Sequence, residues 1–100
     1  PLVANENNHA YHLYPLQINF DDINASKKEI FERLARHGIR LQVHYIPIYK
    51  HPYYRNLGFQ GMELENAENF YRRVVSLPIY PTLREIEQEH VINTLLKECN

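Results

Sequence analysis

The segment "SKKEIFERLARHGIRLQVHYI", residues 26–46, decides the fold class because a helical pattern passes directly into a strand pattern. Ser26 and Glu29 stand three residues apart, which is the spacing of a capping box at the start of a helix. Gly38 is a typical residue at the end of a helix. Residues 39–46 then alternate between apolar and polar side chains, which predicts a half-buried strand.

A second strand is expected before this helix. Residues 10–20, "AYHLYPLQINF", are rich in Tyr, Leu, Ile and Phe, and that composition favours a strand. Pro15 cannot donate to a sheet hydrogen bond, so we expect this strand at an edge or Pro15 in a non-bonded position. Strand, helix and strand in this spacing are typical of a βαβ unit with parallel strands. One face of the second strand would carry Ile39, Leu41, Val43 and Tyr45.

The rest of the chain adds helices and one extended segment. Residues 47–59 can form at most a short helix after Pro52, whereas residues 64–75 have apolar side chains at helical spacing. The extended segment "SLPIYP", residues 76–81, can add a short strand, and residues 83–97 predict a closing helix. We therefore expect a compact α/β domain with two layers, a small sheet and about three helices.

Length, charge and cysteine content exclude several classes of protein. One hundred residues make one domain, and Lys plus Arg number 11 against 12 for Asp plus Glu. Without a net positive charge we expect no nucleic-acid partner, and the short apolar runs predict no membrane span. The single cysteine, Cys99, cannot form a disulfide within the chain, so we expect a reducing, cytoplasmic location. Residues 1–8 are polar and resemble no signal peptide, and the missing initiator Met indicates a piece of a longer protein.

No group of residues forms a complete catalytic or metal site. His9 and His12 would point to opposite faces of a strand. His44 and His51 are separated by six residues that include Pro47, and no Cys pair supports a metal site. Ser26 is explained as a helix cap, and the glycines form no phosphate-binding pattern. The residues alone therefore do not predict a self-sufficient enzyme.

The segment "VHYIPIYKHPYYRNLGF", residues 43–59, concentrates polar and aromatic chemistry. It contains two histidines, four tyrosines, a lysine and an arginine. Aromatic faces beside cationic side chains suit a flat anionic ligand. The alternative is that these rings pack against the helix expected at 64–75 while the two prolines stiffen a connection. The residues leave both interpretations open.

Four segments in chain order carry a resemblance to a known family: "HLYPLQI", "RLARHGIRLQVHYIPIYKHPYYRNLGF", "ENAENFYRRVVSLPIYPTL" and "EHVINTLL". Together they resemble the C-terminal part of the DegT/DnrJ/EryC1/StrS family of sugar aminotransferases, from residue 9 to residue 96. Within the family they are most similar to the enzymes that install the 4-amino group of UDP-linked sugars on the pseudaminic acid pathway.

The resemblance implies that residues 9–100 are the C-terminal small domain of a fold type I aminotransferase. Residues 1–8 would then be an arm or linker from a missing N-terminal large domain. The parent would be a homodimer that transfers an amino group, from glutamate, to a UDP-linked keto-sugar in bacterial surface-sugar biosynthesis. Its pyridoxal phosphate (PLP) would be held by a lysine of the large domain. None of Lys27, Lys28, Lys50 and Lys97 matches that lysine, so the chain alone would bind no cofactor and be inactive.

The resemblance also implies where the substrate would bind. The matching segment of the family helps to shape the sugar-nucleotide pocket. The implied substrate contacts are His44, Tyr45, His51 and Tyr54, with Lys50 or Arg55 as phosphate partners. The sequence departs from the family pattern where Arg84 follows Leu83 in place of a Ser or Thr, and Thr82 is the expected substitute as helix cap.

Two other interpretations belong to different classes of protein. The chain could be a stand-alone module that binds nucleotide sugars or other anionic ligands. It could also be a structural dimerisation domain, whose aromatic surface is an interface rather than a pocket.

Overall fold

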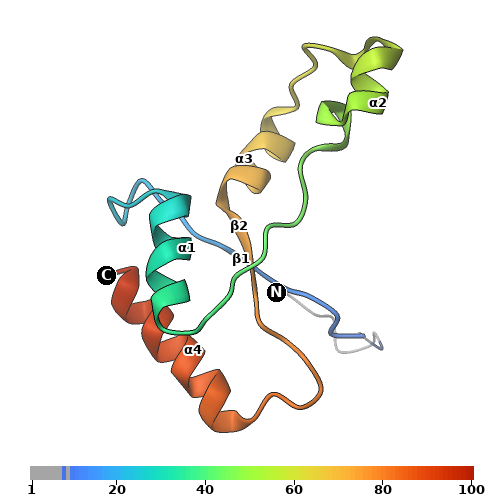
Figure 1. The fold of residues 1–100 in the computed structure, drawn as a ribbon. Coiled ribbons are helices and arrows are strands. Elements are labelled where there is room, and N and C mark those ends of the chain that lie inside the picture. The colour runs from blue at the N-terminus through green and yellow to red at the C-terminus, as the bar shows by residue number, and fades with distance from the viewer. Residues whose placement is uncertain (1–7, 9) are drawn as a thin grey trace.

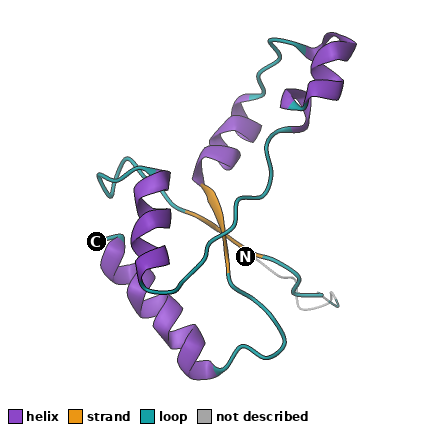
Figure 2. Cartoon of the chain, in the orientation of Figure 1, coloured by secondary structure: helices purple, strands orange, loops and turns teal. Residues whose placement is uncertain are grey.

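The computed structural model describes residues 8 and 10–100. The linker expected at residues 1–8 therefore lies almost wholly outside the described residues. Figures 1 and 2 show a small sheet with two helices on one side and a long projection on the other. The elements in chain order are β1 (Tyr14–Gln17), α1 (Lys27–Arg36), η1 (Ile48–Lys50), α2 (Pro52–Tyr54), η2 (Arg55–Phe59), α3 (Glu65–Arg73), β2 (Val74–Leu77) and α4 (Glu85–Glu98). In the part of the chain that the structure describes, no helix is long and apolar enough to cross a bilayer.

The strand β2 is the centre of the sheet. It pairs with β1 in the antiparallel sense, with Tyr14 opposite Leu77. On its other side, Ser76 exchanges two backbone hydrogen bonds with Gln42: the Ser76 amide donates over 2.7 Å and the Ser76 carbonyl accepts over 3.1 Å. The backbone of β2 therefore holds two segments that are far apart in the sequence.

The strand expected at residues 39–46 is reduced to this single bridge at Gln42. Ile39 and Leu41 are buried as predicted, but Val43 is 41% exposed and Tyr45 is 70% exposed. The prediction failed beyond Leu41, because the core shared with the helices ends there and neither later side chain is covered. The alternating pattern had placed Val43 and Tyr45 on the same face of the strand as Ile39 and Leu41.

The predicted parallel pair is only partly correct. Both β1 and the segment at Gln42 run antiparallel to β2, so they run in the same direction, as in a βαβ unit. They are not neighbours, because β2 lies between them. Pro15 lies opposite Ser76, whose amide and carbonyl both point to Gln42. The missing amide proton of Pro15 therefore costs no ladder bond, and its predicted non-bonded edge position is confirmed.

The helix α1 begins with the predicted capping box. The Glu29 amide donates to Ser26 Oγ over 3.2 Å, and the Ser26 amide donates to a Glu29 carboxylate oxygen over 2.7 Å. Hydrogen bonds from Ser26 lower the pKa of Glu29. The helix ends near Gly38, which has a φ of +77° that other residues rarely adopt.

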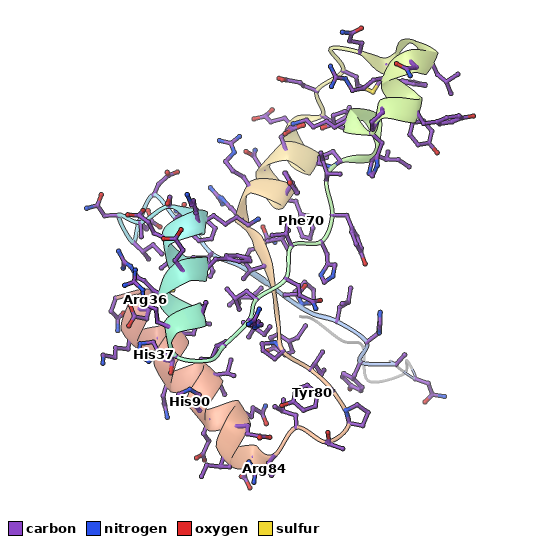
Figure 3. All side chains as sticks on the ribbon, in the orientation of Figure 1. Arg36, His37, Phe70, Tyr80, Arg84 and His90 are labelled. Atoms are coloured by element: carbon purple, nitrogen blue, oxygen red, sulfur yellow. The ribbon has the colours of Figure 1, made fainter. Side chains whose placement is uncertain are left out.

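The core lies between the sheet and the two helices α1 and α4. Ile30, Leu34 and Val75 have no exposed surface, and they pack with Ile18 and Ile39. A polar contact also ties the helices together at one end, since His90 of α4 lies 3.0 Å from the carbonyl oxygen of His37 (Figure 3). A helical layer on a small sheet is the predicted α/β two-layer class.

The domain is not compact, although we expected it to be. Its radius of gyration is 16.0 Å, whereas a compact chain of this length has about 13 Å. Residues 43–73 contribute to this extension, since they run out from the sheet through η1, α2 and η2 and return through α3 (Figure 1). We call this segment the arm. Its exposed apolar side chains include Ile46, Ile48, Tyr53, Leu57, Phe59, Met62, Leu64 and Phe70.

The last helix begins two residues later than predicted, and its cap is not Thr82. The residue before α4 is Arg84, whose amide donates to a Glu87 carboxylate oxygen over 2.9 Å. The Arg84 guanidinium also pairs with Glu87 at 2.8 Å, which lowers the pKa of that carboxyl. A carboxylate from inside the helix therefore replaces the expected hydroxyl.

Replacing Leu34 by Ala should destabilise the domain by about 2–5 kcal/mol, because it leaves a cavity in the fully buried layer. The control is Leu96→Ala, since Leu96 is 59% exposed and its loss should cost less than about 1 kcal/mol. Urea unfolding of the 100-residue variants measures both. Equal losses would contradict this location of the core.

Candidate functional site

The first candidate site surrounds His44, which is half-buried where the arm leaves the sheet. Its Nδ1 lies 2.7 Å from the hydroxyl of Ser76, a buried residue of β2. The ring borders a hollow of about 370 Å³, which we call the His44 hollow. It is lined by His12, Leu13, Arg40, Gln42, His44, Tyr45, Ser76, Leu77, Pro78, Ile79 and Tyr80.

The His44 hollow has cationic and hydroxyl groups but no acid among the described residues that line it. Arg40 provides a permanent positive charge, and Tyr45 and Tyr80 provide hydroxyl groups. The Tyr45 ring meets the His44 ring edge-on, with 4.6 Å between centroids. This lining suits an anionic or oxygen-rich ligand. Arg40 was not a predicted site residue, because in the sequence it only marks the polar side of the expected strand.

Lys50 lies in a second environment, further along the arm. Its Nζ is 2.6 Å from one carboxylate oxygen of Glu68, and the Tyr49 hydroxyl donates to the other oxygen over 2.6 Å. These contacts join η1 to α3. Hydrogen bonding from Lys50 and then Tyr49 lowers the pKa of Glu68, and the same bond raises the pKa of Lys50. Lys50 is therefore held as a cation, with much of its charge already matched.

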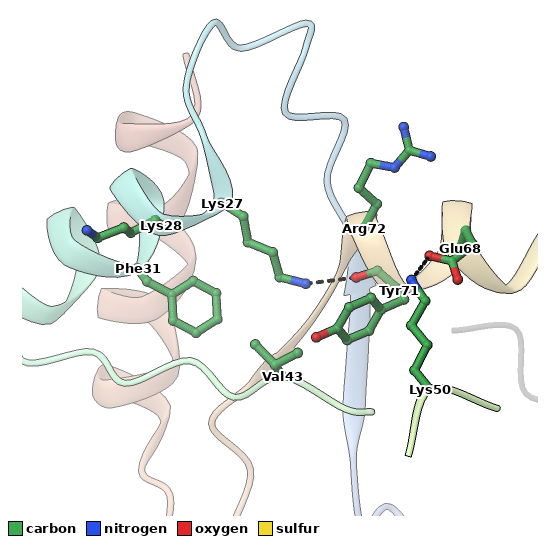
Figure 4. Close-up of a pocket in the computed structure, with 8 residues that line it drawn as sticks. All are labelled: Lys27, Lys28, Phe31, Val43, Lys50, Glu68, Tyr71 and Arg72. Carbon is green, nitrogen blue, oxygen red and sulfur yellow. Dashed lines mark hydrogen bonds and ion pairs between the residues drawn. The ribbon is translucent and has the colours of Figure 1, made fainter. Parts of the chain in front are cut away.

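A larger hollow of about 600 Å³ lies between α1 and α3, and we call it the Lys27 hollow (Figure 4). Lys27 Nζ donates to the carbonyl oxygen of Tyr71 over 2.9 Å and lies 5.2 Å from the centre of the Tyr71 ring. Burial lowers the pKa of Lys27. Phe31 and Val43 provide apolar walls, and Lys50 reaches the edge. Sequence reasoning missed Lys27 because its partner lies 44 residues away.

The remaining predicted residues lie near the tip of the arm. Tyr54 packs edge-on against Tyr53 and Phe59, with centroids 5.2 and 6.5 Å away. Arg55 is exposed beside a hollow of about 320 Å³ that Lys50 also lines. His51 is exposed and lines none of these hollows. The six predicted residues therefore do not form a single site: His44 and Tyr45 meet at the sheet, whereas the others follow the arm.

The described residues form no cluster of metal ligands, and the Lys27 hollow does not suit PLP. Within residues 8 and 10–100, no three His, Cys, Asp or Glu side chains cluster as metal ligands. The Lys27 hollow is lined by lysines and aromatic rings, but the one carboxylate of its described lining, Glu68, is already bonded to Lys50 and Tyr49. No acid is therefore left there to pair with the ring nitrogen of PLP, so these residues do not fit that cofactor.

Comparison with known proteins identifies the family. The model of the DegT/DnrJ/EryC1/StrS aminotransferase family matches residues 1–96. The chain belongs to this family. The resemblance noted in the four sequence segments is therefore confirmed.

Solved structures and curated relatives match most of this chain. Helicobacter pylori PseC, an aminotransferase involved in the biosynthesis of pseudoaminic acid, is 37% identical, with a TM-score of 0.77 over 87% of this chain and 23% of that one. A Campylobacter jejuni UDP-4-amino-4,6-dideoxy-N-acetyl-beta-L-altrosamine transaminase is 37% identical over 84 residues, which are 84% of this chain and 22% of the relative. Spr1654 from Streptococcus pneumoniae, solved in its PLP form, is 28% identical, with a TM-score of 0.69 over 88% of this chain and 22% of that one.

The chain spans about a quarter of the length of the curated relatives that it matches. The relatives contain far more polypeptide than the two-layer domain described above. PLP is the cofactor of solved relatives such as Spr1654, and the match covers only 22% of that chain.

Glu68→Gln should flatten the acid side of the pH–stability profile. The folded-state pKa of Glu68 is lowered below its usual 4.5, so its contribution is present above that value and is lost as the pH falls through the lowered pKa. The raised pKa of Lys50 gives a contribution that is present below 10.5 and is lost as the pH rises through the raised value. Urea midpoints between about pH 3 and pH 7 measure the acid side.

The control is Glu89→Gln, because Glu89 is exposed on α4 and makes no ion pair with a described residue. If the urea midpoint fell equally steeply with decreasing pH in wild type and in Glu68→Gln, the role given to the Lys50 contact would be contradicted.

Proposed function

We propose that residues 9–100 form the small domain of a longer PLP-dependent aminotransferase, with residues 1–8 as its linker to a large N-terminal domain. The enzyme transfers an amino group, from glutamate, to a keto-sugar nucleotide in bacterial surface-sugar biosynthesis. The proposal is supported by membership of the family and by the 37% identity to an aminotransferase of pseudoaminic acid biosynthesis. PLP and its lysine belong to the rest of the enzyme.

The observation that carries the substrate proposal is the His44 hollow. A sugar nucleotide presents phosphate and hydroxyl oxygens, and the lining offers Arg40, His44 and tyrosine hydroxyls without a competing acid among the described residues. In this proposal His44 and Tyr45 orient the sugar nucleotide. Lys50 and Arg55 attract its phosphates further along the arm, and His51 and Tyr54 are further proposed contacts there.

The arm gives this domain its place in the proposed enzyme. It exposes a row of apolar side chains from Ile46 to Phe70, and such surfaces in soluble proteins commonly mark contacts with other polypeptide. We assign these contacts to the large domain and to the second subunit of a cytoplasmic homodimer. Family membership does not favour the stand-alone binding module or the purely structural dimerisation domain.

In the intact enzyme, His44→Ala should raise the KM for the sugar nucleotide about tenfold, because a hydrogen bond to a charged ligand is lost. Tyr54→Phe should raise it by a smaller factor. The PLP absorbance should stay the same in both variants, since neither residue holds the cofactor. Steady-state kinetics and the visible spectrum measure these effects.

The control is His90→Ala, because His90 lies on α4 and does not line the His44 hollow. Its KM should equal that of wild type. Wild-type kinetics in both His44→Ala and Tyr54→Phe would refute the pocket assignment.

A further inference from the structure

The hydrogen bond between His44 and Ser76 decides what the ring offers to a ligand. His44 Nδ1 lies 2.7 Å from Ser76 Oγ, and Ser76 is 3% exposed. Among residues 8 and 10–100, neither Ser76 Oγ nor His44 Nε2 has another hydrogen-bond partner. The location of the proton in this one bond therefore determines whether Nε2 donates or accepts.

Burial of Ser76 favours one arrangement of that proton. If the neutral ring donated from Nδ1, the serine hydroxyl hydrogen would be left without an acceptor in a buried position, which is costly. If the hydroxyl donates to Nδ1, both partners of this hydrogen bond are satisfied, and the ring hydrogen lies on Nε2, where it is available to a ligand. In the protonated ring both nitrogens carry hydrogen, and Nδ1 donates to Oγ instead. Nε2 is therefore an N–H donor in either protonation state.

The surroundings of the ring match such a donor. The described lining of the His44 hollow contains Arg40 and His12 but no Asp or Glu. An acceptor-only group with negative charge can satisfy the Nε2 hydrogen, the guanidinium of Arg40 and the hydroxyl of Tyr80 together. A ligand group that only donates hydrogen bonds would find no partner at Nε2.

We infer that Ser76 is a positioning residue that fixes His44 as an Nε2–H donor to an oxyanion, a phosphate or carboxylate oxygen, bound in the His44 hollow beside Arg40. The inference rests on the proposed function only for the source of the oxyanion. That source is the diphosphate of the sugar nucleotide or a carboxylate of the amino donor. Sequence reasoning placed Ser76 at the start of the extended segment 76–81 and gave it no role at the site.

Nitrogen NMR of the ¹⁵N-histidine-labelled intact protein tests the tautomer, with His44→Gln to assign the ring. Wild type should show an unprotonated Nδ1 and a protonated Nε2 for neutral His44. Ser76→Ala should change this pattern toward a mixture, and Ser76→Thr, which restores a hydroxyl, should recover it. The matched control is Ser26→Ala, which removes the other serine hydroxyl of the chain and should leave the His44 signals unchanged.

A neutral His44 with its proton on Nδ1 in wild type would overturn the inference, and that measurement needs no variant to fold. A Ser76→Ala spectrum identical to wild type would also overturn it.

Titration of the same labelled protein identifies the oxyanion. Inorganic pyrophosphate should shift the His44 Nε2 signal if the site takes the diphosphate, and glutamate should shift it if the site takes a carboxylate. Arg40→Gln should weaken the effective ligand about tenfold, because a charged hydrogen-bond donor is lost. An Nε2 signal that responds to neither ligand would overturn the oxyanion site.

Kinetics separate this inference from the proposed function. Ser76→Ala should raise the KM for the substrate that supplies the oxyanion, with little change in kcat, and Ser76→Thr should restore it. If the enzyme did not act on keto-sugar nucleotides, the proposed function would fail while the tautomer and the titration still tested the site.

Discussion

The hydrogen bonds of Ser76 hold the candidate site to the core. Its amide and carbonyl bind Gln42 over 2.7 and 3.1 Å, and its hydroxyl binds His44 over 2.7 Å. Because Ser76 is buried, each group left without a partner there would cost about 1–3 kcal/mol. The next residue in β2 toward the N-terminus, Val75, is fully buried in the core. Adjacent residues of one short strand thus pack the core and orient the site.

This arrangement gives the domain a packed part and a projecting part. The sheet with α1 and α4 forms the packed part, whose core does not involve the tip of the arm. The arm is braced where Lys50 and Tyr49 meet Glu68. Beyond that brace most apolar side chains are exposed, as expected for a surface that contacts other polypeptide. In the proposed enzyme, the His44 hollow lies where the arm leaves the sheet, and the packed part can set its geometry.

The sequence predicted those features whose causes are local. The start of α1 follows from Ser26 and Glu29, three residues apart, and its end from Gly38, so both were predictable. The central position of β2 was not, because strand order depends on partners more than thirty residues away. The family resemblance nominated His44 and Tyr45, which share a hollow, but the role of Ser76 depends on burial and contact. Neither can be read from a lone serine before a leucine and a proline.

A crystal structure of the intact protein with a bound sugar nucleotide tests the account most directly. The account predicts that Ser76 Oγ keeps its hydrogen bond to His44 Nδ1, and that His44 Nε2 and Arg40 lie within hydrogen-bonding distance of an oxyanion. A PLP group would be held by residues outside residues 1–100. A His44 ring turned away from Ser76, or a His44 hollow filled by an apolar or purely donating group, would contradict it.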